Sequence, residues 1–283
     1  MSFLDRVSAF APPDLAGYLP FRIAGHEVGS IRPAFARELE AFPAVFRVAA
    51  DGVFLADGLK EPAARTEAVE GALRHLADKG LVPNWTGERY RVATAFSASP
   101  LFAIERAAVP LLGVRAYGVH VNGFVRDRKG IRMWIGKRAM DRAVAPGRFD
   151  QIVAGGQPAG LSVYENLIKE CGEEASIPPA LAEKARPVGA IYYTVARPEG
   201  LRRDLLFVHD LELPADFTPV NSDGEIESFR LLSLDEVAAI VARGEEFKFN
   251  CALVVIDFLI RHGMIAADDP DYGALIAGMH RWV

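Results

Sequence analysis

The chain has 283 residues, of which 51% are hydrophobic and 24% charged, proportions that suit a globular protein of one or two domains. Its formal net charge of −5 leaves no basic excess to hold a phosphate backbone, so a nucleic acid is not the expected partner. Only two cysteines are present, Cys171 and Cys251, which are too few for a disulfide scaffold and disfavour a cysteine zinc site. Both lie in apolar helical patterns, where a free thiol behaves as a small buried hydrophobic group.

The N-terminal segment, residues 1–21, lacks the uninterrupted apolar stretch of a signal peptide, because Asp5 and Arg6 interrupt it. The longest apolar run, residues 251–260, is too short to span a bilayer and contains Asp257. We therefore expect a cytoplasmic protein with no membrane partner.

The first third of the chain predicts a small α+β unit. Asp51 and Gly52 separate two apolar runs, which is a strong hairpin signal. Residues 66–80 predict a helix that Thr66 caps. Further strands are expected over residues 21–31 and 89–96, and a helix interrupted before Pro110 over residues 103–113.

From about Tyr117 onward the pattern is a mixed one of strands and helices. Strands are expected in residues 117–127, 131–139 and 189–214, and a strand followed by helices in residues 227–263. The change predicts two domains, an N-terminal α+β accessory domain over residues 1–114 and an α/β domain over residues 115–283.

A glycine-containing stretch, "GGQPAGLSVYENLIKECGEEASI", begins at Gly155 and leads into a helix. Ser162 and Glu165 have the spacing of a capping box, so the helix should begin at about Val163. Val163, Leu167 and Cys171 then define its buried stripe. Glu165 and Lys169 are placed to form an i, i+4 ion pair.

Three glutamates, Glu170, Glu173 and Glu174, stand at i, i+3 and i+4 near the end of this helix. Their spacing predicts that the carboxylates converge, although like charges and the helix dipole both disfavour that. One interpretation is a solvated acidic face. The other is that divalent cations neutralise the patch, since Mg²⁺ prefers carboxylate oxygens and retains waters for a phosphate-bearing substrate.

The stretch resembles the Nudix box, G-x5-E-x7-R-E-U-x-E-E-x-G-U, in which U is a bulky aliphatic residue. Gly155, Glu170, Glu173, Glu174 and Ile177 match it. It departs from the pattern where Leu161 replaces the first glutamate, Lys169 the arginine and Ser176 the late glycine, and Cys171 fills an aliphatic position. The replaced glutamate and arginine form an internal structural pair in the family, so the departures affect the motif more than the metal chemistry.

The resemblance extends over nearly the whole chain, to the Nudix subfamily related to the domain fused to thiamin pyrophosphokinase. It implies a Nudix α/β/α sandwich with a mixed sheet, preceded by a small N-terminal domain. It also implies Mg²⁺- or Mn²⁺-dependent hydrolysis of a small-molecule diphosphate, with oxidised analogues of thiamin diphosphate as substrates. We expect the N-terminal domain to cover the mouth of the active site, and a homodimer is one option for the assembly.

The catalytic set predicted on this basis is Glu170, Glu174 and Glu225, the last as the base or an extra ligand, with Glu170, Glu173 and Glu174 as metal ligands. Candidate substrate contacts, each also open to a purely structural role, are Gly155, Gly156, Arg138, His120, Asn122 and Glu227.

Two other functions are kept open. One is a non-catalytic Nudix-fold protein that binds a diphosphate for regulation. The other is an isomerase of the isoprenoid diphosphate type, which is disfavoured because it needs a reactive cysteine or glutamate placed to protonate an alkene, and Cys171 and Cys251 both fall in apolar patterns.

Overall fold

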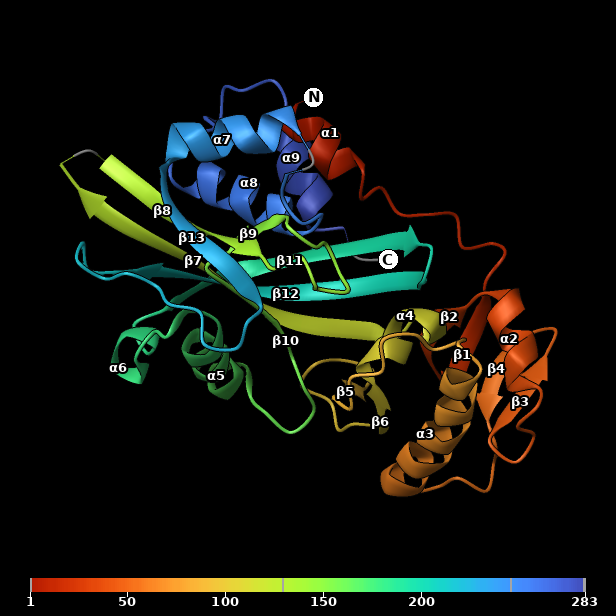
Figure 1. Cartoon of the computed structure of the whole chain (residues 1–283). Coiled ribbons are helices and arrows are strands. Elements are labelled where there is room, and N and C mark those ends of the chain that lie inside the picture. The colour runs from red at the N-terminus through yellow and green to blue at the C-terminus, as the bar shows by residue number, and fades with distance from the viewer. Residues whose placement is uncertain (1, 129, 245, 282–283) are drawn as a thin grey trace.

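A computed structural model describes residues 2–128, 130–244 and 246–281, and a mixed seven-stranded sheet organises its C-terminal part (Figure 1). The strand order is β11-β12-β7-β8-β13, with β10 paired to β7 and β9 to β8. The β12–β7 pair is parallel, whereas the other pairs in this sheet are antiparallel. The strands are β7 (Arg115–Asp127), β8 (Gly130–Arg138), β9 (Phe149–Gln151), β10 (Val153–Gly156), β11 (Arg186–Arg197), β12 (Gly200–Glu212) and β13 (Ile226–Ser233).

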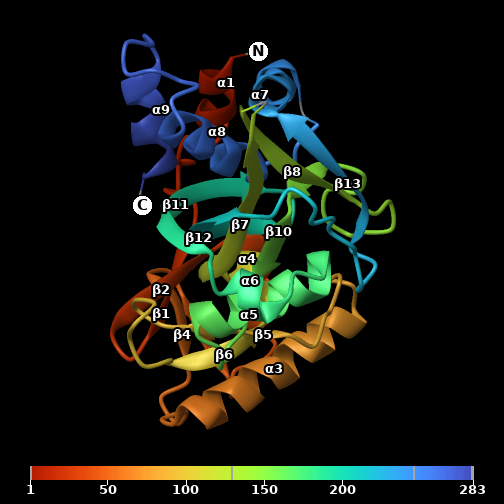
Figure 2. The ribbon, with the colours of Figure 1, turned by 90° about the vertical axis from the view of Figure 1, so that its left-hand side faces the viewer.

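Helices cover both faces of this sheet, which confirms the expected α/β layers (Figures 1 and 2). One face carries α1, α7, α8 and α9, and an apolar cluster that includes Leu253, Ile256 and Phe258 fills the space between them. The other face carries α5 and α6, with Leu167 and Cys171 in the core beneath them. The helices are α1 (Phe3–Ser8), α5 (Val163–Ala175), α6 (Pro179–Ala182), α7 (Leu234–Arg243), α8 (Cys251–Arg261) and α9 (Tyr272–Met279).

The N-terminal unit lies on the α5 side of the large sheet and has its own core (Figure 2). The expected hairpin is confirmed, since Ala49 pairs with Gly52 across the turn at Asp51. The unit comprises β1 (Leu19–Ile23), β2 (His26–Ile31), β3 (Phe46–Ala49) and β4 (Gly52–Leu55), the ribbon of β5 (Arg89–Val92) and β6 (Phe102–Glu105), and the helices α2 (Pro33–Leu39), α3 (Pro62–Asp78), η1 (Arg106–Ala108) and α4 (Val109–Leu112).

Two helix boundaries in this unit differ from the sequence expectation. Helix α3 begins at Pro62, one turn before Thr66, because proline suits the first helical turn, where no N–H partner is needed. The Thr66 hydroxyl instead donates to the Pro62 carbonyl oxygen. The expected helix over residues 103–113 is a strand up to Glu105 followed by two short helices, with Pro110 in the first turn of the second.

Helix α1 belongs to the N-terminal part of the chain but packs against α7, α8 and α9 (Figure 1). Val7 and Phe10 are buried in the same apolar cluster as α8, whereas the core of the N-terminal unit begins at Phe21. The first helix thus joins the helical layer of the C-terminal part. The division between residues 114 and 115 stays a prediction.

Candidate catalytic and metal-binding site

The start of α5 is fixed by the expected capping box. Ser162 accepts a hydrogen bond from the Glu165 N–H at 3.1 Å, and the Glu165 carboxylate accepts from the Ser162 N–H at 2.8 Å. Asn166 in the first turn donates to the Gly156 carbonyl oxygen at 2.8 Å, which ties the helix to β10. The expected Glu165–Lys169 pair is wrong, because Glu165 is engaged in the cap and the Lys169 ammonium lies 2.6 Å from the Glu173 carboxylate.

Glu170 and Glu174 project from α5 toward β10, and their residues are only 8% and 4% exposed. The Glu174 carboxylate accepts a hydrogen bond from the Ala154 N–H at 2.7 Å. The Glu170 carboxyl lies directly over Gly155, where an added Cβ would be 2.2 Å from Glu170 Cδ. Gly155 therefore provides the space that this side chain occupies, a function that only glycine can serve at this position.

Burial raises the pKa of Glu174 to about 8, and the neighbouring charge of Glu170 adds to the effect. Burial also raises the pKa of Glu170, although the nearby Lys169 ammonium opposes the change. Two carboxyl groups held close together out of water resist ionisation unless a cation joins them. A divalent cation fits this pair, because oxygen ligands with negative charge are what hard cations bind.

We expect metal binding at pH 7 to release about one proton, because Glu174 must ionise before it can ligate. Titration calorimetry with Mn²⁺ in buffers of different ionisation enthalpy measures the number of protons released. This number should be lower at pH 9 than at pH 7. Metal binding without proton release at pH 7 would contradict the assignment.

The raised pKa of Glu174 also affects the stability of the metal-free protein. The folded state loses stability as the pH rises from 4.5, the ordinary pKa of the carboxyl group, to about 8, its pKa in the folded protein.

The third glutamate, Glu173, faces outward, so the expected convergence of all three carboxylates is only partly found. Its backbone carbonyl accepts a hydrogen bond from the Ser222 hydroxyl at 2.6 Å, and Val220 N–H donates to the Ala175 carbonyl at 3.1 Å. These contacts dock the loop before β13 on the end of α5. Glu225 in this loop lies 2.6 Å from Arg142, and its charge contributes to the raised pKa of Glu174, after burial, Glu170 and Asp150.

The remaining predicted site residues lie elsewhere on the sheet. Arg138 is buried and pairs with Asp150 at 3.1 Å, while Glu227 pairs with Lys137 at 2.9 Å nearer the surface. His120 and Asn122 are buried. They lie on the opposite face of the sheet from Val121, which belongs to the core beneath α5. The His120 ring is 2.8 Å from the Gln151 amide oxygen, and the Asn122 amide donates to Asp210 at 3.1 Å.

Sequence reasoning missed a buried group of possible metal ligands formed by His120, Asp150 and Cys251, whose ligand atoms lie within 4.8 Å of one another. The Cys251 thiol donates to Asp150 at 2.6 Å, and the Arg138 and Lys248 cations flank the same carboxylate. Burial and the Lys248 charge lower the pKa of His120 to about 4, so its ring is neutral. A metal ion is disfavoured here, because two cations already lie beside Asp150, which provides the carboxylate of this group. Hydrogen bonds within the network satisfy the polar atoms of the group instead.

The N-terminal unit also contributes side chains beside α5, which nothing in the local sequence pattern indicates. The Tyr90 hydroxyl lies against Gly156, where an added Cβ would be 1.5 Å from it, and Ala159 N–H donates to the Arg89 carbonyl at 2.7 Å. Arg106 lies 3.0 Å from Glu88. Interaction with Tyr90, and then with the carboxylates of Glu88 and Glu225, raises the pKa of Arg106. The Glu88 charge contributes to the raised pKa of Glu170, so this ion pair of the N-terminal unit acts on the acidic site.

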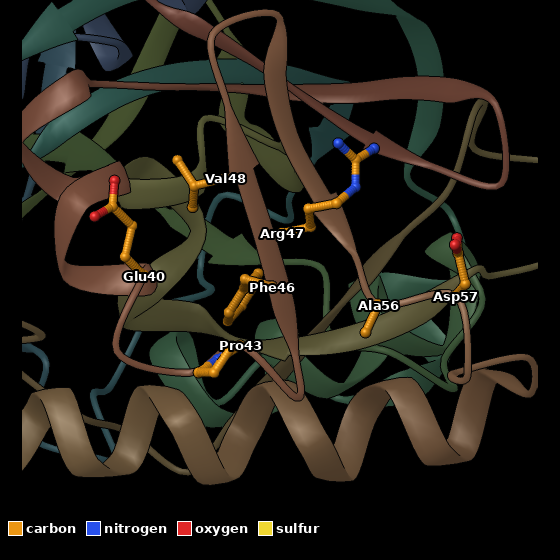
Figure 3. Close-up of a pocket in the computed structure, with 7 residues that line it drawn as sticks. All are labelled: Glu40, Pro43, Phe46, Arg47, Val48, Ala56 and Asp57. Carbon is orange, nitrogen blue, oxygen red and sulfur yellow. The ribbon is translucent and has the colours of Figure 1, made fainter.

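A separate cavity of about 410 Å³ lies within the N-terminal unit itself (Figure 3). Glu40, Arg47 and Asp57 line it together with apolar residues. None of the predicted site residues lines this cavity, and it is therefore not part of the candidate active site.

Ser176 ends α5 in the left-handed conformation, with φ at 50°, at the position where the Nudix box has glycine. A serine in this conformation is strained by about 1 kcal/mol relative to glycine. We expect Ser176→Gly to raise the free energy of unfolding by about 1 kcal/mol. Urea denaturation measures the change, and a destabilised variant would show that the serine hydroxyl has a compensating role.

Comparison with known proteins places this chain in a family. Residues 2–116 match the family model described as "Domain of unknown function (DUF4743)". The chain is 44% identical over 261 residues to Nudix hydrolase 24, chloroplastic, of Arabidopsis thaliana, covering 91% of this chain and 71% of that protein. Nudix hydrolase 20, chloroplastic, of the same plant is 42% identical over 268 residues, with the same coverage. The crystal structure of DR0079 from Deinococcus radiodurans is similar with a TM-score of 0.44 and 24% identity, covering 60% of this chain and 98% of that one.

The cytoplasmic location expected from the sequence is contradicted by the two plant relatives, both of which are named chloroplastic. The expectation rested on tests for a secretory signal and a membrane span, and neither test distinguishes a plastid from the cytoplasm. Among the described residues, no helix has the length and apolarity that crossing a membrane requires.

Nudix hydrolases generally use a divalent metal ion, which agrees with the buried carboxylate pair on α5. Both plant relatives exceed 40% identity over 91% of this chain, and the shared region includes β10 and α5. The chain therefore belongs to the Nudix hydrolase family, and it is a hydrolase that acts on diphosphate bonds.

Proposed function

We propose that the site is a pyrophosphohydrolase centre in which Glu170 and Glu174 hold Mg²⁺ or Mn²⁺. The observation that carries the proposal is the pair of buried carboxyl groups whose pKa values are raised by burial. A structural role alone would be better served by apolar side chains at these two positions, because burying carboxyl groups is costly. When bound, the metal supplies charge neutralisation for the diphosphate and makes water more acidic.

The residues of the chain have separate tasks in this reaction. The Ala154 N–H holds the Glu174 carboxylate in place, and Gly155 makes room for Glu170. Glu225 is the proposed base that accepts a proton from water, with Arg142 positioning its carboxylate. Water adds to one phosphorus, the bridging P–O bond breaks, and the second phosphate leaves.

For the substrate we propose a small-molecule diphosphate, with oxidised thiamin diphosphate analogues hydrolysed to the monophosphate as the specific case. The resemblance of nearly the whole sequence to the subfamily related to the domain fused to thiamin pyrophosphokinase supports this choice. Arg106 of the N-terminal unit, which pairs with Glu88 at 3.0 Å, is the proposed contact for the phosphates, because its charge also interacts with Glu225.

The test is a screen of product masses with Mg²⁺ and with Mn²⁺. Its substrates are thiamin diphosphate, its oxy and oxo analogues, ADP-ribose, nucleoside diphosphate sugars and dinucleotides. We expect metal-dependent release of a monophosphate from at least one of them, with the oxidised thiamin analogues preferred. Binding of a diphosphate without turnover under any of these conditions would overturn the hydrolase proposal in favour of a regulatory binding protein.

A further inference from the structure

A cavity of about 400 Å³ lies between the large sheet and the loop that follows β5. Its lining includes Phe96 from the N-terminal unit and Tyr117, Leu205 and Tyr192 from three neighbouring strands of the sheet. Phe96 contacts both Tyr117 and Phe207 with ring centroids 4.9 Å apart, in edge-to-face geometry. The cavity is therefore built jointly by the two parts of the chain, and its walls are largely aromatic.

The strand registers place this cavity on the same face of the sheet as Glu170. Gly155, which lies under the Glu170 carboxyl, pairs with Val119, and Val119 pairs with Phe207. The next row along the strands, Tyr117, Leu205 and Tyr192, forms the floor of the cavity. Paired residues in a sheet share a face, so the spacing of strands and residues puts Tyr117 about 8 Å from Gly155.

The surroundings of the cavity are positively charged. Arg115 is part of the lining, and the Arg91 guanidinium lies 5.1 Å from the centre of the Phe96 ring. Arg203 on β12 adds a further guanidinium group. Burial lowers its pKa, and the positive charge of Arg115 lowers it further. An aromatic wall with guanidinium groups around it suits a flat ring that carries negative charge elsewhere in the same molecule.

We propose that this cavity binds the planar heteroaromatic group of the diphosphate substrate, with its ring against Phe96 and the row formed by Tyr117, Leu205 and Tyr192. The inference rests on the proposed function, because the diphosphate must lie at Glu170 and Glu174. A linker the length of a sugar or a short alkyl chain spans the distance from there to Tyr117. The N-terminal unit then contributes to specificity directly, since Phe96 is one wall of the ring-binding cavity.

The test compares a diphosphate that carries a heteroaromatic ring, ADP-ribose or thiamin diphosphate, with a ring-free one, isopentenyl diphosphate. We expect Phe96→Ala to raise KM for the ring-bearing substrate about tenfold with little change in kcat, and to leave the ring-free substrate unaffected. Phe96→Leu, which retains apolar packing, should have a similar effect. Equal effects on both substrates, or none on either, would overturn the proposal.

The matched control is Phe54→Ala, because Phe54 is also a half-buried phenylalanine of the N-terminal unit beneath an arginine, Arg47, 4.0 Å from its ring centre. This variant should leave both KM values unchanged. If the unmodified protein hydrolyses none of the diphosphates, the proposed function fails and the cavity is tested by binding alone. Calorimetry with AMP or thiamin monophosphate should then show binding that Phe96→Leu weakens, and unchanged binding in Phe96→Leu would reject the cavity assignment.

Discussion

Replacing Glu174 by glutamine should lower kcat/KM for diphosphate hydrolysis by about 10³-fold, because several kcal/mol of transition-state stabilisation depend on the metal. The amide oxygen of glutamine can still accept the hydrogen bond from Ala154 N–H, so the backbone contact is retained. The negative charge is lost, and with it the affinity for Mg²⁺ or Mn²⁺. Steady-state kinetics over a range of metal concentrations measures both effects.

The same substitution should not destabilise the metal-free protein. Burial penalises the ionised form of Glu174, so a neutral amide of nearly the same shape removes that penalty at neutral pH. We expect the Tm without metal to be equal or higher in Glu174→Gln, and the rise in Tm on adding Mn²⁺ to disappear. A variant that keeps this metal-induced rise would show that the ligand lies elsewhere.

Glu165→Ala is the matched control, because Glu165 lies on the same helix but belongs to its cap. Loss of the capping box should lower the free energy of unfolding by about 1 kcal/mol. Metal affinity and turnover should remain close to those of the unmodified protein. The two glutamate variants should thus separate function from stability within one helix.

Gly155→Ala should lower kcat/KM by about 10²-fold with only a small loss of stability. The added methyl group would overlap the Glu170 carboxyl, whose Cδ is 2.2 Å from the position of the new Cβ. Glu170 has a flexible side chain, so it can move away at little cost in folding. Its carboxylate would then be displaced by an ångström or more from the metal site, and a displacement of that size costs about two orders of magnitude in rate.

Gly172→Ala provides the comparison, since nothing lies within 4 Å of the position where its Cβ would be. Gly172 occupies the interior of α5, where alanine is favoured by about 1 kcal/mol. This variant should be more stable and fully active. Chemical denaturation and steady-state kinetics on both glycine variants measure the contrast, and full activity in Gly155→Ala would contradict the placement of Glu170.

Local features of the site could be predicted from the sequence where one helix determines them. The capping box at Ser162 and Glu165, the start of α5 and the burial of Cys171 follow from spacing alone, and the structure confirms them. Spacing also put Glu170 and Glu173 on one patch, but the sheet lies on only one side of α5. Glu170 is therefore buried against β10, and Glu173 is left to pair with Lys169.

Contacts between distant segments could not be predicted in this way. Tyr90 and Gly156 are neighbours only because β5 of one unit lies against the end of β10 and the residues that follow it. Asp150, which joins Arg138, Lys248 and Cys251, gathers partners that lie up to 101 residues away along the chain. Periodicity reports the face on which a residue lies, and it contains no information about which segment covers that face.

The packing of α1 has a consequence for the order in which the chain folds. Arg6 in this helix donates a hydrogen bond to the Val241 carbonyl oxygen, 235 residues further along the chain, at 3.2 Å. During synthesis, helix α1 leaves the ribosome well before α7, α8 and α9, on which it docks. Its attachment therefore depends on a contact between residues 235 positions apart, and non-local contacts of this kind slow folding because much of the chain must be ordered before they form.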